Sequence, residues 1–291
     1  MRSDDDSWDI VTGVGATALF VAAARALEAQ KIEPFAVDPY AAVFCDAAEG
    51  DWADVVHGNA PFHQLVAPGF GEHFVNFQGA RTRFFDDFLR VAVAGGIRQV
   101  VIPAAGLDSR AYRMIWPDDA VLYELDRGPV LDWKHNVMEQ CGFSPAVSLR
   151  EVPVDLREDW QRALVESGFD STVPSAWLVE GLLLYLPAEA QASLFRGIDC
   201  QSAPGSHLAA NDSAPMDPAE FAVKLAEERQ SRLTSHFDLI YNERVASVVD
   251  WFGEHGWTAG ETPVAEFLSR AGRPTPGPTI ARDAFVTAVK G

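Results

Sequence analysis

The chain of 291 residues has few cysteines and few basic side chains, and both shortages exclude classes of protein. Its three cysteines, Cys45, Cys141 and Cys200, are widely spaced and form no CxxC pair. This spacing argues against a structural zinc site or a disulfide framework. Lysine and arginine total 23 against 42 aspartates and glutamates, for a net charge of −19. Because nucleic-acid binding needs clustered basic side chains, we expect no nucleic-acid partner.

The sequence also lacks a long apolar run and a leader-like beginning. The most apolar early segment, residues 16–27, is interrupted by Arg25 and is too short to span a bilayer. The first ten residues, MRSDDDSWDI, are acidic where a signal peptide is basic and then apolar. An odd number of cysteines suits a reducing compartment. Together these features predict a cytoplasmic protein with no membrane partner.

Several catalytic motifs are absent. The seven histidines show no metal-binding spacing and HExxH does not occur, so we expect no metal cofactor. There is no G-x-S-x-G nucleophile elbow and no P-loop. A nicotinamide-dependent oxidoreductase would need a proton donor such as Y-x-x-x-K, yet Tyr112, Tyr185 and Tyr241 are followed at that offset by Trp, Glu and Val.

What is present is a strand, turn, helix, strand pattern between Val100 and Asp126. An apolar run, 100–105, ends in a small-residue turn with Gly106. An amphipathic segment follows, and then a second apolar run that ends in Asp126. Asp126 lies 20 residues beyond Gly106, where a Rossmann-type unit places the carboxylate that binds ribose hydroxyls. The pattern therefore predicts a nucleoside-bearing cofactor.

From residue 96 onward, apolar runs of strand length alternate with amphipathic segments of helical length. The apolar runs predict seven strands, at residues 100–105, 121–125, 147–154, 176–179, 206–211, 257–258 and 284–289. Helices are predicted at residues 17–29, 78–94, 107–115, 129–140, 158–167, 187–198, 217–235, 245–254 and 264–271. Such alternation indicates an α/β fold built on a doubly wound, mainly parallel sheet.

Ligands in this architecture bind at the carboxyl ends of the parallel strands. Gly106, Asp126, Asp155 and Glu180 occupy those positions, so that acids close three successive strands. Glu180 stands between apolar residues and needs a cation, which would be a ligand ammonium or a buried arginine. For Asp155 the alternative is a role as the cap of the helix that follows it, and one carboxylate could do both jobs.

The predicted helix 78–94 carries one arginine on its apolar face. Arg81 precedes Phe84 and Phe85 by three and four residues, which places it on their stripe, whereas Arg83 falls on the polar side. A buried guanidinium needs an anion. That anion would be a cofactor carboxylate, which suits bidentate binding by arginine, or an internal acid such as Asp86.

Seven segments, taken in order, resemble one family over nearly the whole length of the chain. They are SWDIVTGVGATALFVAAARALEA near the start, VDPYA at 37–41, GARTRFFDDFL at 79–89, IPAAGLDSRAYR at 102–113, YELD at 123–126, PVDL at 153–156 and VEGLLLYLP at 179–187. In these segments the chain is similar to the bacterial S-adenosyl-L-methionine (SAM)-dependent methyltransferases related to leucine carboxyl methyltransferase. The resemblance implies a Rossmann-like class I methyltransferase fold with SAM as cofactor.

The resemblance also implies roles for residues around the methionine part of SAM. Arg81 would bind the methionine carboxylate, and Arg25 would be a second partner of that group. Glu180 would face the methionine amino group. The turn that ends at Gly106 would pass beneath the cofactor.

For the nucleoside part, the resemblance implies that Asp126 accepts both ribose hydroxyls. Asp155 would accept from the adenine amino group, and the Leu156 backbone N–H would bond a ring nitrogen. One departure is physical: the usual G-x-G turn reads Ala104-Ala105-Gly106 here. A dinucleotide enzyme needs that glycine so that the backbone can approach a pyrophosphate, which SAM lacks, so the departure favours SAM over NAD.

The resulting hypothesis is a SAM-dependent methyltransferase that methylates oxygen on a small molecule or carboxylate acceptor. A carboxylate acceptor is already ionised and needs no general base, whereas a phenol or alcohol needs one. We expect a single domain over residues 1–291, with a helical cap at 1–95, a core at 96–291 and an acceptor lid at 212–244. An NAD(P)-dependent oxidoreductase and a non-catalytic SAM binder are the alternatives.

Overall fold

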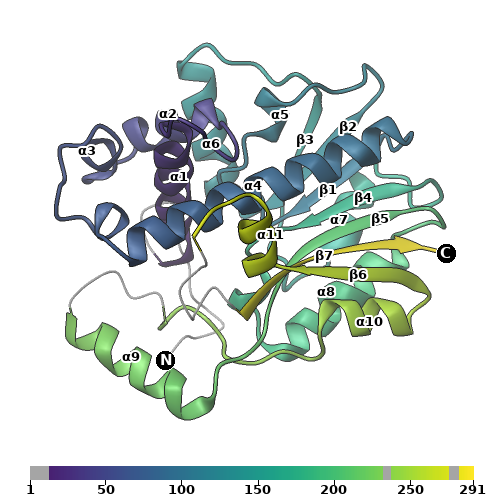
Figure 1. Cartoon of the computed structure of the whole chain (residues 1–291). Helices are drawn as coiled ribbons and strands as arrows, with labels where there is room; N and C mark the ends of the chain where they lie inside the picture. The colour runs from purple at the N-terminus through teal and green to yellow at the C-terminus, as the bar shows by residue number, and fades with distance from the viewer. Residues whose placement is uncertain (1–12, 232–236, 275–281) are drawn as a thin grey trace.

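The computed structural model describes residues 13–231, 237–274 and 282–291, and a seven-stranded sheet lies at its centre (Figure 1). The strands are β1 (Gln99–Pro103), β2 (Val121–Asp126), β3 (Ser148–Pro153), β4 (Ser175–Val179), β5 (His207–Ser213), β6 (Trp257–Pro263) and β7 (Asp283–Lys290). Each predicted strand is present. β6 extends well beyond the predicted 257–258. The sequence does not reveal its length, because this edge strand is mostly exposed and shows no apolar alternation.

The strand order is β3-β2-β1-β4-β5-β7-β6. β1 to β5 pair in parallel, and β7 is antiparallel to both β5 and β6. The predicted, mainly parallel seven-stranded sheet is confirmed, with β7 as its antiparallel member. The chain winds outward in both directions from β1, which lies between β2 and β4. The carboxyl ends of these three strands therefore meet at the topological switch point, where ligands bind in open α/β sheets.

The segment before the sheet forms α1 (Gly13–Ala29), α2 (Pro39–Ala47), α3 (Trp52–Val56), the 3-10 turn η1 (Gln64–Val66) and α4 (Phe70–Ala94). Asp38 caps α2 by accepting from the Tyr40 N–H, and Pro39 takes the first helical position. α4 begins at Phe70 rather than at the predicted residue 78. Its early turns carry glycines and polar residues among the aromatics, which hides the helical period.

The helices after β1 are α5 (Arg110–Arg113), α6 (Gly128–Gln140), α7 (Trp160–Glu166), α8 (Ala188–Cys200), α9 (Pro218–Ser231), α10 (Val248–Glu254) and α11 (Val264–Arg270), with a 3-10 turn η2 (Leu183–Tyr185). The helix predicted at 107–115 is only four residues long. Residues 232–235 of the helix predicted at 217–235 lie outside the described residues. No described helix combines the length and apolarity that crossing a bilayer requires.

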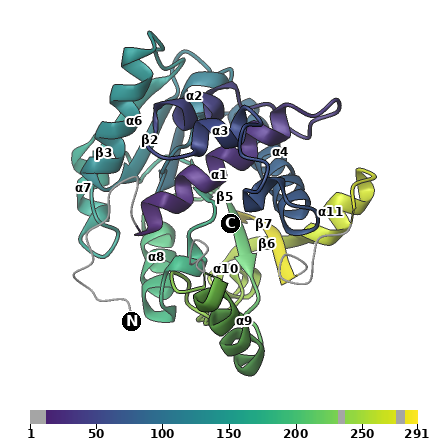
Figure 2. The same ribbon diagram turned by 90° about the vertical axis from the view of Figure 1, so that its left-hand side faces the viewer.

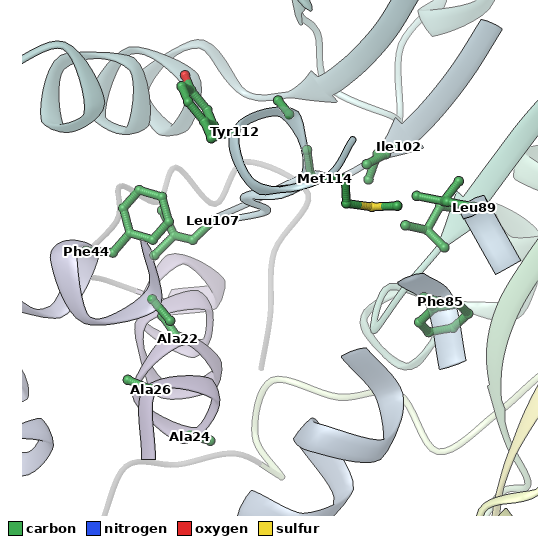
Figure 3. Close-up of a cluster of buried hydrophobic side chains, with 14 of the residues drawn as sticks. Ala22, Ala24, Ala26, Phe44, Phe85, Leu89, Ile102, Leu107, Tyr112 and Met114 are labelled. Atoms are coloured by element: carbon green, nitrogen blue, oxygen red, sulfur yellow. The ribbon is translucent and has the colours of Figure 1, made fainter. Parts of the chain in front are cut away.

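Apolar side chains cover both faces of the sheet. Helices α1, α2, α4, α6 and α11 cover one face, while α7, α8 and α10 cover the other (Figures 1 and 2). In Figure 3, Phe44 of α2 lies beside Leu107, and Leu89 of α4 faces Met114. α1 presents alanines to this core, which allows its backbone to approach closely. The N-terminal helices therefore pack directly over the turn that follows β1.

Candidate functional site

The turn after β1 is held against the end of β2. The Gly106 N–H donates to Asp126 Oδ2 over 2.7 Å, and the Ala105 N–H donates to the Leu125 carbonyl over 3.1 Å. Both Ala104 (φ +53°) and Gly106 (φ +51°) adopt left-handed backbone. Ala104, at the first position of the usual G-x-G, thus adopts the conformation that glycine normally provides.

Asp126 lies at the end of β2, as the sequence predicts. Its second oxygen accepts from the Arg127 N–H over 2.7 Å, so each carboxylate oxygen already holds one backbone donor. Burial raises the pKa of Asp126, and the two backbone hydrogen bonds oppose that rise. Each oxygen keeps a further acceptor site, which is the arrangement that two neighbouring hydroxyl groups require.

Asp155 and Leu156 follow β3, next to Asp126. The Val154 N–H donates to the Asp126 carbonyl over 2.9 Å, which joins the two strand ends. Arg157 holds the Asp155 carboxylate through its backbone N–H and its guanidinium, and this pairing lowers the pKa of Asp155. The capping alternative for Asp155 is wrong, because α7 begins at Trp160 and Asp159 caps it by accepting from the Arg162 N–H.

Arg81 and Glu180 come together in the structure as an ion pair. Arg81 Nε lies 2.9 Å from Glu180 Oε1, and both side chains are buried. Glu180 Oε2 also accepts from Arg110 Nη1 over 2.8 Å. Of the alternatives that the sequence left open, a buried arginine for Glu180 is found, whereas Asp86 does not pair with Arg81. Burial lowers the pKa of Arg81, and Glu180 opposes that shift.

Gly181 makes room for the Arg81 side chain. A Cβ atom on Gly181 would lie 2.8 Å from Arg81 Nη1, and the glycine has a φ of +62°. The two residues that follow β4 therefore both position Arg81. Glu180 provides the opposite charge, and Gly181 leaves space for the guanidinium.

Arg25 is engaged by protein groups in the structure. Its Nη2 donates to the Leu107 carbonyl over 2.8 Å, and its Nε lies 3.3 Å from Asp38 Oδ2. It thereby ties α1 to the turn after β1 and to the cap of α2. The expected contact of Arg25 with a cofactor carboxylate stays a prediction.

The arginines of α5 were not predicted as site residues from the sequence. Arg110 contacts Asp86, Asp108 and Glu180, and Arg113 contacts Asp86 and Ser109. Ser109 in turn donates to Asp38 over 2.8 Å. The available signal was the pair of arginines at i and i+3 in a segment expected to lie at the site. One buried network links four arginines and four acids: Arg25, Arg81, Arg110, Arg113, Asp38, Asp86, Asp108 and Glu180.

A second buried ion pair, between Lys134 and Glu124, contacts the turn after β1. Lys134 of α6 and Glu124 of β2 form an ion pair that is fully buried, and Lys134 Nζ also donates to the Asp108 carbonyl over 3.2 Å. Burial raises the pKa of Glu124 to about 7, and Lys134 opposes the rise. The pair ties the turn to both the sheet and α6.

Acids also gather where β5 ends and β7 begins, a group that the sequence analysis did not identify. Asp212 accepts from the Val248 N–H over 3.0 Å and lies 3.2 Å from Arg244 Nη1. Asp283 accepts from Ser213 Oγ, and burial raises its pKa to about 7. The positive charge of Arg81 opposes that rise. Asp212 and Asp283 therefore lie together at the carboxyl end of β5, where Asp283 pairs with Ser213. Among the described residues, no cluster of histidine, cysteine or acidic side chains is arranged to hold a metal ion.

The strand order and the acid-ended strands define the α/β fold that SAM-dependent methyltransferases use. A crystal structure from Thermobifida fusca YX, described as "a putative methyltransferase", matches with a TM-score of 0.54 at 18% identity, over 85% of this chain and 93% of that one. A protein of the duf574 family from Streptomyces avermitilis matches with a TM-score of 0.51 at 15% identity, over 86% and 96% of the two chains. These likenesses establish the shared fold.

The sequence comparisons specify the family. The model of leucine carboxyl methyltransferase matches residues 18–199. Proteins of Mycobacterium bovis and Mycolicibacterium paratuberculosis, both named "Putative S-adenosyl-L-methionine-dependent methyltransferase", are each 54% identical to this chain, with 100% of both chains covered. The chain belongs to the leucine carboxyl methyltransferase family. It is a SAM-dependent methyltransferase with SAM as its cofactor, and the oxidoreductase alternative is set aside.

Proposed function

We propose that this methyltransferase binds SAM across the carboxyl ends of β1 to β4 and transfers its methyl group to an oxygen atom of a small acceptor. The observation that carries the binding mode is the Asp126 carboxylate, which is fixed by Gly106 and Arg127 and still has room for two hydroxyl donors. SAM supplies a sulfonium methyl group, which is transferred by in-line displacement.

In this proposal the roles of the residues follow from their positions. Asp126 accepts the ribose hydroxyls, Asp155 accepts from the adenine amino group, and the Leu156 N–H bonds a ring nitrogen. Gly106 lies beneath the cofactor because a residue without Cβ lets the ligand approach the turn.

The methionine part fits the Arg81 and Glu180 pair. The buried Nε of Arg81 forms no hydrogen bond, so that the guanidinium has a donor to offer a carboxylate. Glu180 offers its charge to the ammonium group. A zwitterionic amino acid therefore matches the two side chains.

Oxygen as the acceptor atom is supported by the family, whose description names a carboxyl group. A carboxylate acceptor needs no proton removed, so alignment and exclusion of water are the enzyme's whole task. For a hydroxyl acceptor, Asp283 is a candidate base, because it lies where β5 ends and its pKa is raised to about 7.

We further propose one domain in which residues 1–95 form the cap and 212–244 form the acceptor lid. Residues 218–229 of α9 are all at least partly exposed, and the helix lies apart from the sheet (Figures 1 and 2). Glu220 of α9 pairs with Arg282 beside β7. A helix that is weakly packed and anchored at the site is suited to move over an acceptor.

Calorimetric titration with SAM tests the binding mode. We expect wild-type protein to bind SAM with a dissociation constant in the roughly micromolar range, and Asp126→Ala to lose that binding, because two hydroxyl partners disappear together. Asp119→Ala is the control, since this exposed acid pairs with Arg98 before β2 begins. Equal SAM binding by wild type and Asp126→Ala would refute the role of Asp126.

The acceptor atom is tested with methyl-labelled SAM and a pool of small organic acids and phenols. Mild base releases volatile methanol from a methyl ester but leaves a methyl ether intact. Volatile label indicates a carboxylate acceptor, and base-stable label on a phenol indicates a hydroxyl acceptor. Label recovered on nitrogen or sulfur would overturn the proposal of oxygen.

A further inference from the structure

Arg110 is the most heavily paired cation of the buried network. Its side chain is 2% exposed, and it contacts three carboxylates. Nε donates to Asp86 over 2.8 Å, and Nη1 donates to Asp108 and, over 2.8 Å, to Glu180. Burial opposes the charge of Arg110, but the three acids outweigh it and raise the pKa of Arg110. Arg110 is therefore a cation that stays in place.

Arg81 is bound much less firmly. Among the residues that the structure describes, its one ion-pair partner is Glu180, and at 2.9 Å the Nε group does not have hydrogen-bond geometry to that oxygen. Glu180 thus lies between a firmly held arginine and a loosely held one. Of its two partners, Arg81 is the one that a ligand can take away.

The charges of the network favour such an exchange. The buried members comprise four arginines and four carboxylates, so they balance without a ligand. An amino-acid group brings one carboxylate and one ammonium and keeps the balance. A ligand with only one of these charges would leave a buried charge unpaired, which is strongly unfavourable.

We propose that Arg110 is a positioning residue that holds the Glu180 carboxylate in place while the methionine carboxylate of SAM takes Arg81. Glu180 then meets the ligand's ammonium without moving to follow Arg81. The inference rests on the proposed roles of Arg81 and Glu180 and adds the residue that makes the exchange possible.

The test compares two ligands on two variants. SAM carries the amino-acid group, whereas 5′-methylthioadenosine carries only the nucleoside and thioether. In Arg110→Lys the charge stays but the fork that spans Asp86 and Glu180 is lost. We expect SAM affinity to fall about 10- to 100-fold, as for a lost charged hydrogen bond, and methylthioadenosine affinity to stay within about twofold.

Arg113→Lys is the matched control. Arg113 lies on the same short helix, is nearly as buried and shares Asp86, but no contact joins it to Glu180. We expect it to lose thermal stability with the ratio of the two affinities unchanged. A parallel fall of both affinities in Arg110→Lys, or an equal change of the ratio in Arg113→Lys, would overturn the positioning role.

Glu180→Asp provides a second test that retains every charge. If Arg110 holds the carboxylate, the shortened side chain stays with Arg110, falls short of the ammonium, and weakens SAM but not methylthioadenosine. Unchanged SAM affinity would show that Arg110 does not hold this carboxylate. Failure of the wild type to bind either ligand would instead refute the proposed binding mode, so the two failures are distinguishable.

Discussion

Ala104 is a single residue whose conformation does not suit its side chain. Its φ of +53° is left-handed, a conformation that costs an L-residue about 1–2 kcal/mol. The turn nevertheless forms, with its hydrogen bonds to Leu125 and Asp126. The left-handed backbone of Ala104 therefore has an energetic cost that mutation should reveal.

We predict that Ala104→Gly stabilises the protein by about 0.5–1 kcal/mol, because glycine relieves the strain at the expense of a more flexible unfolded chain. Urea denaturation measures the change. Ala105→Gly is the control, since Ala105 is buried and has no positive φ. This variant should lose a similar amount of stability, because glycine makes the unfolded chain more flexible without relieving strain. A loss of stability in Ala104→Gly contradicts the prediction.

Gly181 offers a second test at the level of one residue. We expect Gly181→Ala to push Arg81 from its place and to lower SAM affinity about tenfold or more. Gly205→Ala provides the comparison, because Gly205 is also left-handed, at φ +83°, but its nearest neighbour is Pro174 at 3.6 Å. Both variants should lose stability, and only Gly181→Ala should lose SAM binding in calorimetry. Equal SAM binding by both would contradict the role of Gly181.

At the scale of elements, the loop between β3 and α7 contains two aspartates, Asp155 and Asp159, that have different roles. From the sequence alone, either could cap the helix that follows. Asp159 caps the helix, while Asp155 lies against the end of β2 through the bond between Val154 and Asp126. Sequence spacing could not assign the cap, because helix starts are uncertain by several residues when only local signals are used. The structure assigns each acid a different neighbourhood.

These neighbourhoods predict opposite effects of two similar variants. Asp159→Ala should cost about 1 kcal/mol of stability through the lost cap and leave SAM binding unchanged. Asp155→Ala should change stability little, because its partner Arg157 is adjacent and partly exposed, but should weaken SAM roughly 5- to 20-fold. Thermal unfolding and calorimetry on both proteins check the pair. The reverse pattern would assign the ligand role to Asp159.

For the whole molecule, two buried acids make stability depend on pH. Burial raises the pKa of Asp283 to about 7 and that of Glu124 to about 7, above the ordinary values of 3.8 and 4.5. The folded protein therefore binds protons more tightly than the unfolded chain. Stability from these groups is present below pH about 4 and is lost as the pH rises through about 7.

We therefore predict that the free energy of unfolding falls from pH 5 to pH 7, with each such group contributing up to about 1.4 kcal/mol per pH unit. Asp283→Asn should flatten this slope, because an amide does not titrate. Urea denaturation across the pH range gives the two slopes. Parallel slopes in the variant and the wild type would show that Asp283 does not titrate in this way.

Local patterns predicted much of the fold and the positions of two candidate site residues, Asp126 and Arg81. Asp126 follows from the spacing between a small-residue turn and the end of the next strand, both set by neighbours along the chain. Arg81 follows in the same way, because its position on an apolar helical face shows that it is buried. The mutual pairing of Arg81 with Glu180 could not be predicted, since each residue has several possible partners until α4 is packed against β4.

The sequence by itself determined the seven strands, the acids at their ends and the family of the chain, because hydrophobic period and turn residues act over a few neighbours. Only the tertiary structure decided that β7 runs antiparallel between β5 and β6, that Arg110 connects three acids, and that Asp212 and Asp283 lie together where β5 ends and β7 begins. The physical reason is that a buried charge must find an opposite charge in space. Which one it finds depends on how distant segments pack.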